Sequence, residues 1–333
     1  VEAGDPAAAL QYWQQALVRY PAFTRTSHDS LDVLIGLKRY EEAEPLMLEG
    51  MKRERHDPFF AQGYARIAEH RGDLETAIER WARVRKRYPG APDAYIAGSR
   101  CLRAAGRLDD AEKLNATAIK RFSKDLRVWM EWAQLSEATG DLDEALSRWE
   151  TVAEKYPHVI CEQSIARVLE KLGRLDDVEA RLRQARLRFP IDPTLAVARA
   201  ELADRRGDRE DAARCWGDVM RRFPRLVRGY QEAHRALLAV DRIADAEAAM
   251  VDAMDRFPTD AWPAINHASL ASRRQDWTEA VTRWGWVRER WPDRAEGYLR
   301  SAEALAALGQ KDEAENLRAR YRERQQPAMN QGS

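Results

Sequence analysis

A proline that follows an aromatic residue returns along this chain at a nearly constant interval. Successive prolines lie 34 residues or a multiple of 34 apart, with one step of 33, at Pro21, Pro89, Pro157, Pro190, Pro224, Pro258 and Pro292. A fixed period of this length indicates one small structural unit repeated along the chain. Because a unit this short cannot bury a core alone, the repeats must stack on one another.

Two further series keep the same interval and predict two antiparallel helices in each repeat. Glycine precedes the proline position by 17 residues and allows a tight turn with positive φ. These glycines are Gly4, Gly72, Gly106, Gly140, Gly173, Gly207 and Gly309, while Lys38, Asp241 and Gln275 fill the remaining turn positions. Five residues after the turn position, nine of ten repeats carry alanine, for example Ala145. A small side chain there lets two helix axes approach to roughly 8–10 Å.

The second helix of each repeat carries two more regular positions. Four residues after the alanine comes a large apolar side chain, often tryptophan, on the same helix face. These residues are Trp13, Met47, Trp81, Trp149, Leu182, Trp216, Met250 and Trp284; Asn115 and Arg318 replace them in two repeats, where we expect looser packing. A basic residue always stands two places before the proline position, where it interacts with the negative end of the helix dipole.

This pattern of glycine, alanine, large apolar residue and proline resembles the tetratricopeptide repeat family, in its bacterial type, over essentially the whole chain. The resemblance implies an all-α fold, an α-α superhelix of antiparallel helix pairs. It implies one array at 1–326 and a polar tail at 327–333. The array divides into a half repeat at 1–21 and nine repeats at 24–55, 58–89, 92–123, 126–157, 159–190, 193–224, 227–258, 261–292 and 295–326.

Composition excludes several classes of function. Lys plus Arg and Asp plus Glu are 55 each, so we expect no binding of nucleic acid through net charge. No apolar run is long enough to insert into a membrane. Cys101, Cys161 and Cys215 lie in different repeats at no metal-ligand spacing, which predicts free thiols and a cytoplasmic location, with the periplasm as the alternative. The chain begins within a repeat and without Met, as a piece of a longer protein would.

No motif of catalysis is present in the sequence. The six histidines, at 28, 56, 70, 158, 234 and 267, show no paired metal spacing. There is no glycine-rich phosphate loop and no nucleophile motif. We therefore predict that the chain is not an enzyme and holds no cofactor or metal.

The resemblance implies that positions 2, 5, 6, 9, 12 and 13 of each repeat face a concave groove. The candidate groove residues are Arg66, Arg100, Arg103, Arg127, Gln134, Arg167, Arg235, Trp262 and Asn266. Two interpretations of the arginines stay open. They form a track for an anionic ligand, or they pair with interleaved acids such as Glu69, Glu131 and Glu137. Trp262 is either a binding anchor or a packing residue.

The predicted function is a scaffold that binds a protein or an extended, partly acidic peptide in this groove. One alternative is the substrate-docking region of a larger transferase, similar to glycosyltransferases, whose catalytic domain lies outside this chain. Another is a scaffold in polysaccharide secretion. The Lys and Asn set with which chaperone-binding members clamp a terminal carboxylate is absent. Neither the partner nor the oligomeric state follows from the sequence.

Overall fold

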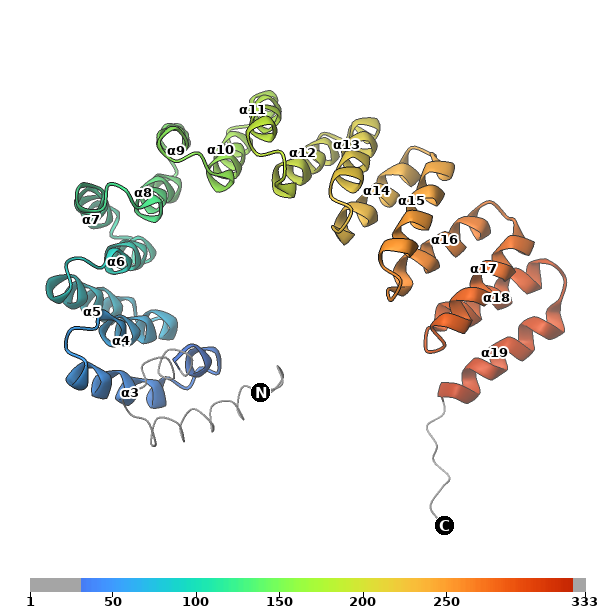
Figure 1. Ribbon diagram of the computed structural model, residues 1–333, viewed down its shortest axis with the longest axis horizontal. Coiled ribbons are helices and arrows are strands. Elements are labelled where there is room, and N and C mark those ends of the chain that lie inside the picture. Colours follow the sequence, from blue (N-terminus) through green and yellow to red (C-terminus); the bar gives the residue numbers. More distant parts are fainter. Residues whose placement is uncertain (1–30, 326–333) are drawn as a thin grey trace, which may run out of the picture. The chain divides into compact units, whose positions relative to one another are not determined.

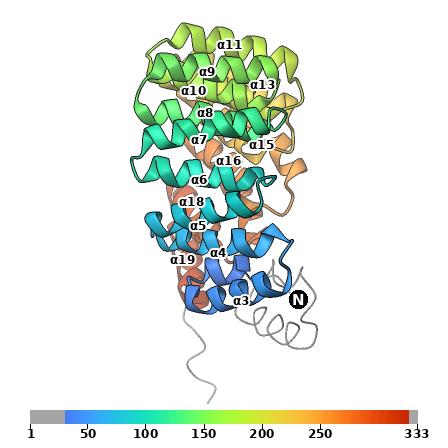
Figure 2. The ribbon, with the colours of Figure 1, turned by 90° about the vertical axis from the view of Figure 1, so that its left-hand side faces the viewer.

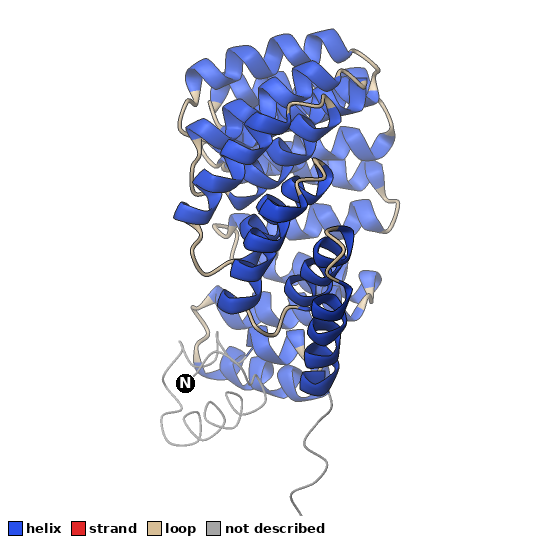
Figure 3. Cartoon of the chain, turned by 90° about the vertical axis from the view of Figure 1, so that its right-hand side faces the viewer, coloured by secondary structure: helices blue, strands red, loops and turns tan. Residues whose placement is uncertain are grey.

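The computed structural model describes residues 31–325, and within this range the chain consists of helices joined by short loops, without strands (Figure 1, Figure 3). The predicted half repeat at 1–21, the start of the first repeat and the tail lie outside the described residues. Contacts divide the chain between Arg174 and Leu175 into two compact units. This boundary falls between the two helices of the fifth repeat, so a single domain at 1–326 stays a prediction.

The helices of the first unit begin where the sequence period predicts. Its helices are α3 (Tyr40–Arg53), α4 (Pro58–Arg71), α5 (Leu74–Arg87), α6 (Pro92–Ala104), α7 (Leu108–Arg121), α8 (Leu126–Thr139), α9 (Leu142–Lys155) and α10 (Val159–Lys171). Even numbers mark the first helix of a repeat and odd numbers the second. The helices stack one above another, with α4, α6, α8 and α10 on the inner side of the curve that this unit follows (Figure 1, Figure 2).

The second unit continues the same order of helices. It contains α11 (Leu175–Arg188), α12 (Pro193–Arg206), α13 (Arg209–Arg222), α14 (Val227–Ala239), α15 (Ile243–Arg256), α16 (Ala261–Arg273), α17 (Trp277–Arg290), α18 (Ala295–Ala307) and α19 (Lys311–Gln325). Here α12 and α14 lie on the inner side of the unit's curve, and α11 and α13 on the outer side (Figure 1). The all-α fold of stacked helix pairs is therefore confirmed.

The turns within repeats have the backbone conformation that their glycines predict. Gly72 and Gly140 end α4 and α8 with φ of 84° and 82°. Lys38, Asp241 and Gln275 take the same left-handed conformation with φ of 58–60°, although a side chain is disfavoured there. The turn geometry is thus set by the repeat rather than by glycine alone.

The alanine and tryptophan positions form the core. Ala145 and Trp149 are fully buried, and Ala77 and Trp81 repeat this contact two repeats earlier. The alanines at the crossing position are buried throughout the described repeats. In the third repeat Asn115 takes the tryptophan position, is buried, and its Nδ2 has no hydrogen-bond partner within the described part of the chain.

Several positions carry different residue types in odd and even repeats, so the full period of the structure is two repeats. The second, fourth, sixth and eighth repeats have the buried tryptophan, and an aspartate such as Asp141 caps their second helix by accepting the N–H of the third residue after it. In the first, third, fifth and seventh repeats the cap position carries arginine, as in Arg107, which pairs with Asp110 at 2.8 Å, and in the ninth it carries Gln310. Trp81 and Trp149 are 68 residues apart, which is two periods.

A second alternating feature joins neighbouring second helices. A glutamate from an odd repeat accepts from an arginine of the next, even repeat: the Nη–Oε distances are 2.8 Å for Arg80–Glu44, 2.9 Å for Arg148–Glu112 and 2.5 Å for Arg283–Glu247. Each of these arginines is mostly buried, so the pairs add to the stacking of odd repeats on even ones.

Candidate functional site

The first helices carry the predicted groove positions, some of which are exposed in each unit. We call the residues at positions 2, 5, 6, 9, 12 and 13 of the first helices the first-helix face. Apolar side chains at position 5 are only partly covered, as at Ile96 and Met130 in the first unit and at Val197 and Ile265 in the second. Ile160 and Leu299 are 39% and 40% exposed. The face therefore offers apolar contact area as well as charge.

Every predicted groove arginine is paired with a carboxylate. Arg66 reaches Asp32 at 2.8 Å, and Arg127 reaches Asp93 at 2.5 Å. Both contacts span one whole repeat. Of the two interpretations that the sequence left open, ion pairing is therefore present, which neutralises part of the charge of the face.

Three of these pairs extend into the core. In the fourth repeat the buried Trp149 donates its indole N–H to Glu137 at 2.9 Å, and Arg167 of the next repeat donates to the same carboxylate at 2.8 Å. Lys171 adds a contact at 3.1 Å. Burial alone would raise the pKa of Glu137, but the hydrogen bonds from Arg167, Trp149 and Lys171 outweigh it and hold this pKa below its ordinary value.

The same triad recurs at a two-repeat period. Its members are Trp81, Glu69 and Arg100 in the first unit, with distances of 3.3 Å and 3.1 Å to the carboxylate, and Trp216, Asp204 and Arg235 in the second, with 2.7 Å and 2.9 Å. Sequence analysis named the arginines and the acids Glu69 and Glu137, but not Asp204 or the bond from each core tryptophan to the carboxylate. The detectable pattern was an acid at position 12 of an even repeat together with arginine at position 9 of the next.

In the eighth and ninth repeats both the acid at position 12 and the arginine at position 9 of the triad are replaced. Ser272 stands where the acid would be and accepts the indole N–H of Trp284 at 3.0 Å. Position 9 of the following repeat is then Glu303, which pairs with Arg300 on its own helix. The indole hydrogen bond is retained, whereas the bridge between first helices is replaced.

Glu131 departs from its expected place in the groove. Its side chain is only 4% exposed and contacts Arg103 at 3.4 Å and Ser99 at 3.3 Å. Burial raises the pKa of Glu131, and Arg103 opposes this effect only in part. Position 6 is buried in the neighbouring repeats as well, at Gly63, Ala97 and Ser164, so Glu131 places a carboxylate in the interior of the stack rather than on the exposed face.

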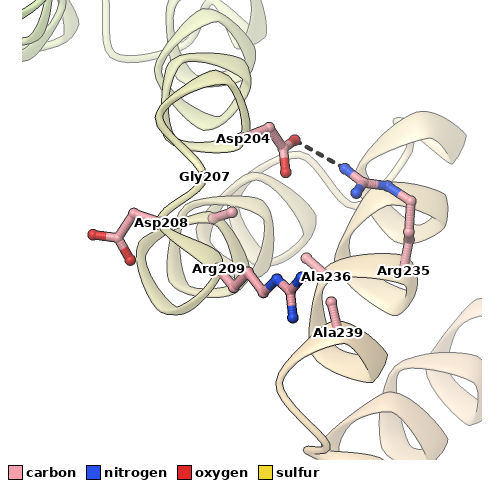
Figure 4. Close-up of a pocket in the computed structure, with 8 residues that line it drawn as sticks. Asp204, Gly207, Asp208, Arg209, Arg235, Ala236 and Ala239 are labelled. Carbon is pink, nitrogen blue, oxygen red and sulfur yellow. Dashed lines mark hydrogen bonds and ion pairs between the residues drawn. The ribbon is translucent and has the colours of Figure 1, made fainter.

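A cleft of about 430 Å³ opens beside the triad of the second unit (Figure 4). Arg209 extends toward its floor of Ala236 and Ala239, and Arg235 bonded to Asp204 stands on the other side (Figure 4). Arg209 occupies a position that is apolar in most other repeats: Tyr40, Leu74, Leu108, Leu142, Leu175, Ile243 and Trp277. Within the described residues Arg209 has no ion-pair partner, so its guanidinium is open to a ligand.

The remaining candidates have local contacts. Trp262 is half-buried against Tyr230 and Met250, and its ring meets that of His234 edge-on at 6.3 Å. Asn266 donates to the carbonyl of Trp262 at 2.8 Å. Gln134 is half-buried and makes no side-chain hydrogen bond inside the described range. Packing therefore accounts for part of the role of Trp262, and binding by these residues stays a prediction.

Two classes of site are not found in residues 31–325. No cluster of His, Cys, Asp or Glu there could hold a metal ion. None of the described helices is both long and apolar enough to cross a membrane. Cys101, Cys161 and Cys215 are free and buried, and burial raises the pKa of their thiols to about 12, 11 and 12. These thiols are accordingly unreactive in the folded chain.

Comparison with solved structures finds chains of similar helical fold. A tetratricopeptide repeat protein from Parabacteroides merdae is 14% identical, with 74% of this chain and 98% of that chain covered and a TM-score of 0.41. The C-terminal part of a repeat-containing protein from Cytophaga hutchinsonii is 14% identical, with 74% and 99% covered and a TM-score of 0.49. Yeast Tom70 is 18% identical, with 99% and 67% covered and a TM-score of 0.47. Comparison with curated proteins gives no match.

Family models place repeats in both units. Two models described as tetratricopeptide repeat match residues 69–135 in the first unit and 265–328 in the second. The 34-residue period and the helix pairs continue between these matches. The chain therefore belongs to the tetratricopeptide repeat family, whose repeats build scaffolds for protein interaction.

Proposed function

We propose that the chain binds an extended, partly acidic segment of another protein along its first-helix face. The binding surface is repeated along the chain, and each repeat advances the stack by about 10 Å. An extended polypeptide covers that distance in about three residues. A partner segment would therefore present one contact residue to each repeat.

The main support for this proposal is that arginines of the first-helix face use only part of their guanidinium group in internal ion pairs. Arg100 donates only its Nε to Glu69, and Arg66 donates only one Nη to Asp32. A guanidinium has five N–H donors, so most of them remain for a second carboxylate. The internal pair fixes the side chain in place and reduces the entropy lost when a ligand binds.

The first-helix face also carries apolar side chains. Ile96 and Met130 lie at position 5 of adjacent repeats, partly exposed between the charged positions. A segment that carries both acidic and apolar side chains matches this alternation. The transferase-docking and polysaccharide-secretion alternatives stay predictions that depend on the sequence alone.

The test begins with a displayed library of random 16-residue peptides, selected on the full chain. We expect the selected peptides to combine Asp or Glu with apolar residues. Their affinities are then measured by calorimetry for two variants with matched exposure, Ile160→Glu on α10 and Leu48→Glu on α3. Ile160 is 39% exposed and Leu48 is 41% exposed.

The matched pair separates the two faces of the first unit. Ile160→Glu should weaken binding at least about tenfold, since it places a charge in an apolar contact that an acidic peptide covers. Leu48→Glu on the second-helix side should change affinity less than about twofold. Loss of binding in Leu48→Glu alone would show that the first-helix face is not the recognition surface.

A further inference from the structure

Trp286 is exposed at a position that is polar elsewhere in the described repeats. It lies on α17 and is 48% exposed. The corresponding residues of the other repeats are Glu49, Arg83, Thr117, Thr151, Gln184, Asp218, Asp252 and Arg320. The repeat fold therefore needs no aromatic residue here, and the packing of the core does not explain this tryptophan.

Trp286 forms one wall of a cleft of about 410 Å³ between α15, the loop after it, and α17. Its ring meets that of Trp291 edge-on, with centroids 5.5 Å apart. Trp291 is itself fixed, because its indole N–H donates to the carbonyl of Thr259 at 3.4 Å. Met254, Phe257 and Pro258 complete the apolar lining. Five of the eight lining residues of the cleft are thus apolar or aromatic, and three of these are aromatic.

The charges around this lining are unequal. Asp255 and Asp260 stand at the cleft with one cation, Arg290. Asp260 uses Oδ1 to accept the N–H of Trp262 at 2.9 Å, which leaves its other oxygen open. Asp255 and Arg290 have no ion-pair partner among residues 31–325. Two carboxylates beside the exposed indole of Trp286 attract a cation, through charge and through the negative face of the ring.

We propose that this cleft binds a basic side chain, arginine or lysine, of a protein partner. The site lies at the ends of second helices and in an inter-repeat loop, so it does not use the first-helix face. It would allow the scaffold to hold a basic segment of one protein independently of an acidic segment in the groove. Arg290 is the internal competitor for the same carboxylates.

The test titrates the full chain with acetyl-Ala-Arg-Ala-amide and with the same peptide carrying neutral citrulline. Indole N–H resonances report binding, and the Trp286 resonance is assigned by its loss in Trp286→Phe. We expect the arginine peptide to shift the Trp286 and Trp291 resonances to saturation, and high salt to weaken the effect. The citrulline peptide should cause less than a third of the shift.

Two variants test whether the charges of Asp255 and Arg290 affect binding of the arginine peptide. Asp255→Asn should weaken binding of the arginine peptide at least threefold, and Arg290→Ala should strengthen it. Glu289→Gln, an exposed change on α17 outside the cleft, should leave binding unchanged. Equal shifts by the two peptides, an acetyl-Ala-Leu-Ala-amide peptide that binds as well, or shifts confined to other tryptophans would overturn the assignment.

Discussion

Glu137 is the best place to test whether the triads stabilise the stack. The variant Glu137→Gln keeps an oxygen for the indole N–H of Trp149 and removes the charge that Arg167 and Lys171 contact at 2.8 Å and 3.1 Å. A hydrogen bond to a charged group is worth about 1.5–3 kcal/mol when it is buried. Because both cations are about half exposed, we reduce each contact to about 0.5–1 kcal/mol. The variant should lose about 1–2 kcal/mol at pH 7.

The sign of the pH dependence follows from the direction of the shift. The pKa of Glu137 is lowered in the folded chain, so its ionised form is favoured by folding. The stabilisation is complete above the unfolded pKa of about 4.3 and is lost as pH falls through the lowered native pKa. The difference between wild type and variant should therefore be constant from pH 7 to about pH 5 and shrink below it.

Urea unfolding followed by circular dichroism at pH 7, 5 and 4 measures this difference. Glu150→Gln is the matched control, an exposed carboxylate on α9 without an ion-pair partner in the described chain, and should stay within about 0.5 kcal/mol of wild type. Equal stability of Glu137→Gln and Glu150→Gln at pH 7 would show that the charged contacts of Glu137 do not stabilise the stack. A deficit that persists undiminished at the lowest pH would assign the effect to shape instead of charge.

Three further predictions concern the core. Ala145→Leu should destabilise by about 1–3 kcal/mol through overpacking of a fully buried position, while the exposed Ser147→Ala should not; equal melting temperatures would contradict the predicted register. Asn115→Met should raise the free energy of unfolding, measured in urea, by about 1–2 kcal/mol, because it removes a buried amide with an unpaired Nδ2. A lower free energy of unfolding would show that the amide is needed. All three cysteines should resist a thiol reagent at pH 8 in the folded chain and react in denaturant without reductant, whereas a single reactive thiol would reveal a disulfide.

Helix boundaries were predictable because the chemistry that sets them is local. Gly140 allows the turn, Asp141 caps the next helix and Pro157 prevents its continuation, each within a few residues of the boundary. The pairing of Arg167 with Glu137 was open at the sequence level, since it depends on how one repeat is placed on the next. A repeat-by-repeat comparison would have exposed the two-repeat alternation.

The departures from the repeat were harder to interpret. Glu131 places a carboxylate at position 6, which is buried in the neighbouring repeats as well, and it contacts Arg103 there. The sequence period shows that Arg209 replaces an apolar side chain, but only the structure shows the cleft that lies beside it and Arg235. Such features arise from the volumes of neighbouring side chains, which a periodic pattern does not encode.

Photocrosslinking shows directly whether a partner binds to the first-helix face. A peptide selected on the full chain is synthesised with a photoreactive residue at each apolar position, and the crosslinked residues are identified by mass spectrometry. We expect crosslinks to first helices, at residues such as Ile96, Met130 and Ile160 in the first unit or Val197 and Ile265 in the second. Crosslinks concentrated on the second helices, at residues such as Leu48 or Val251, would contradict this expectation.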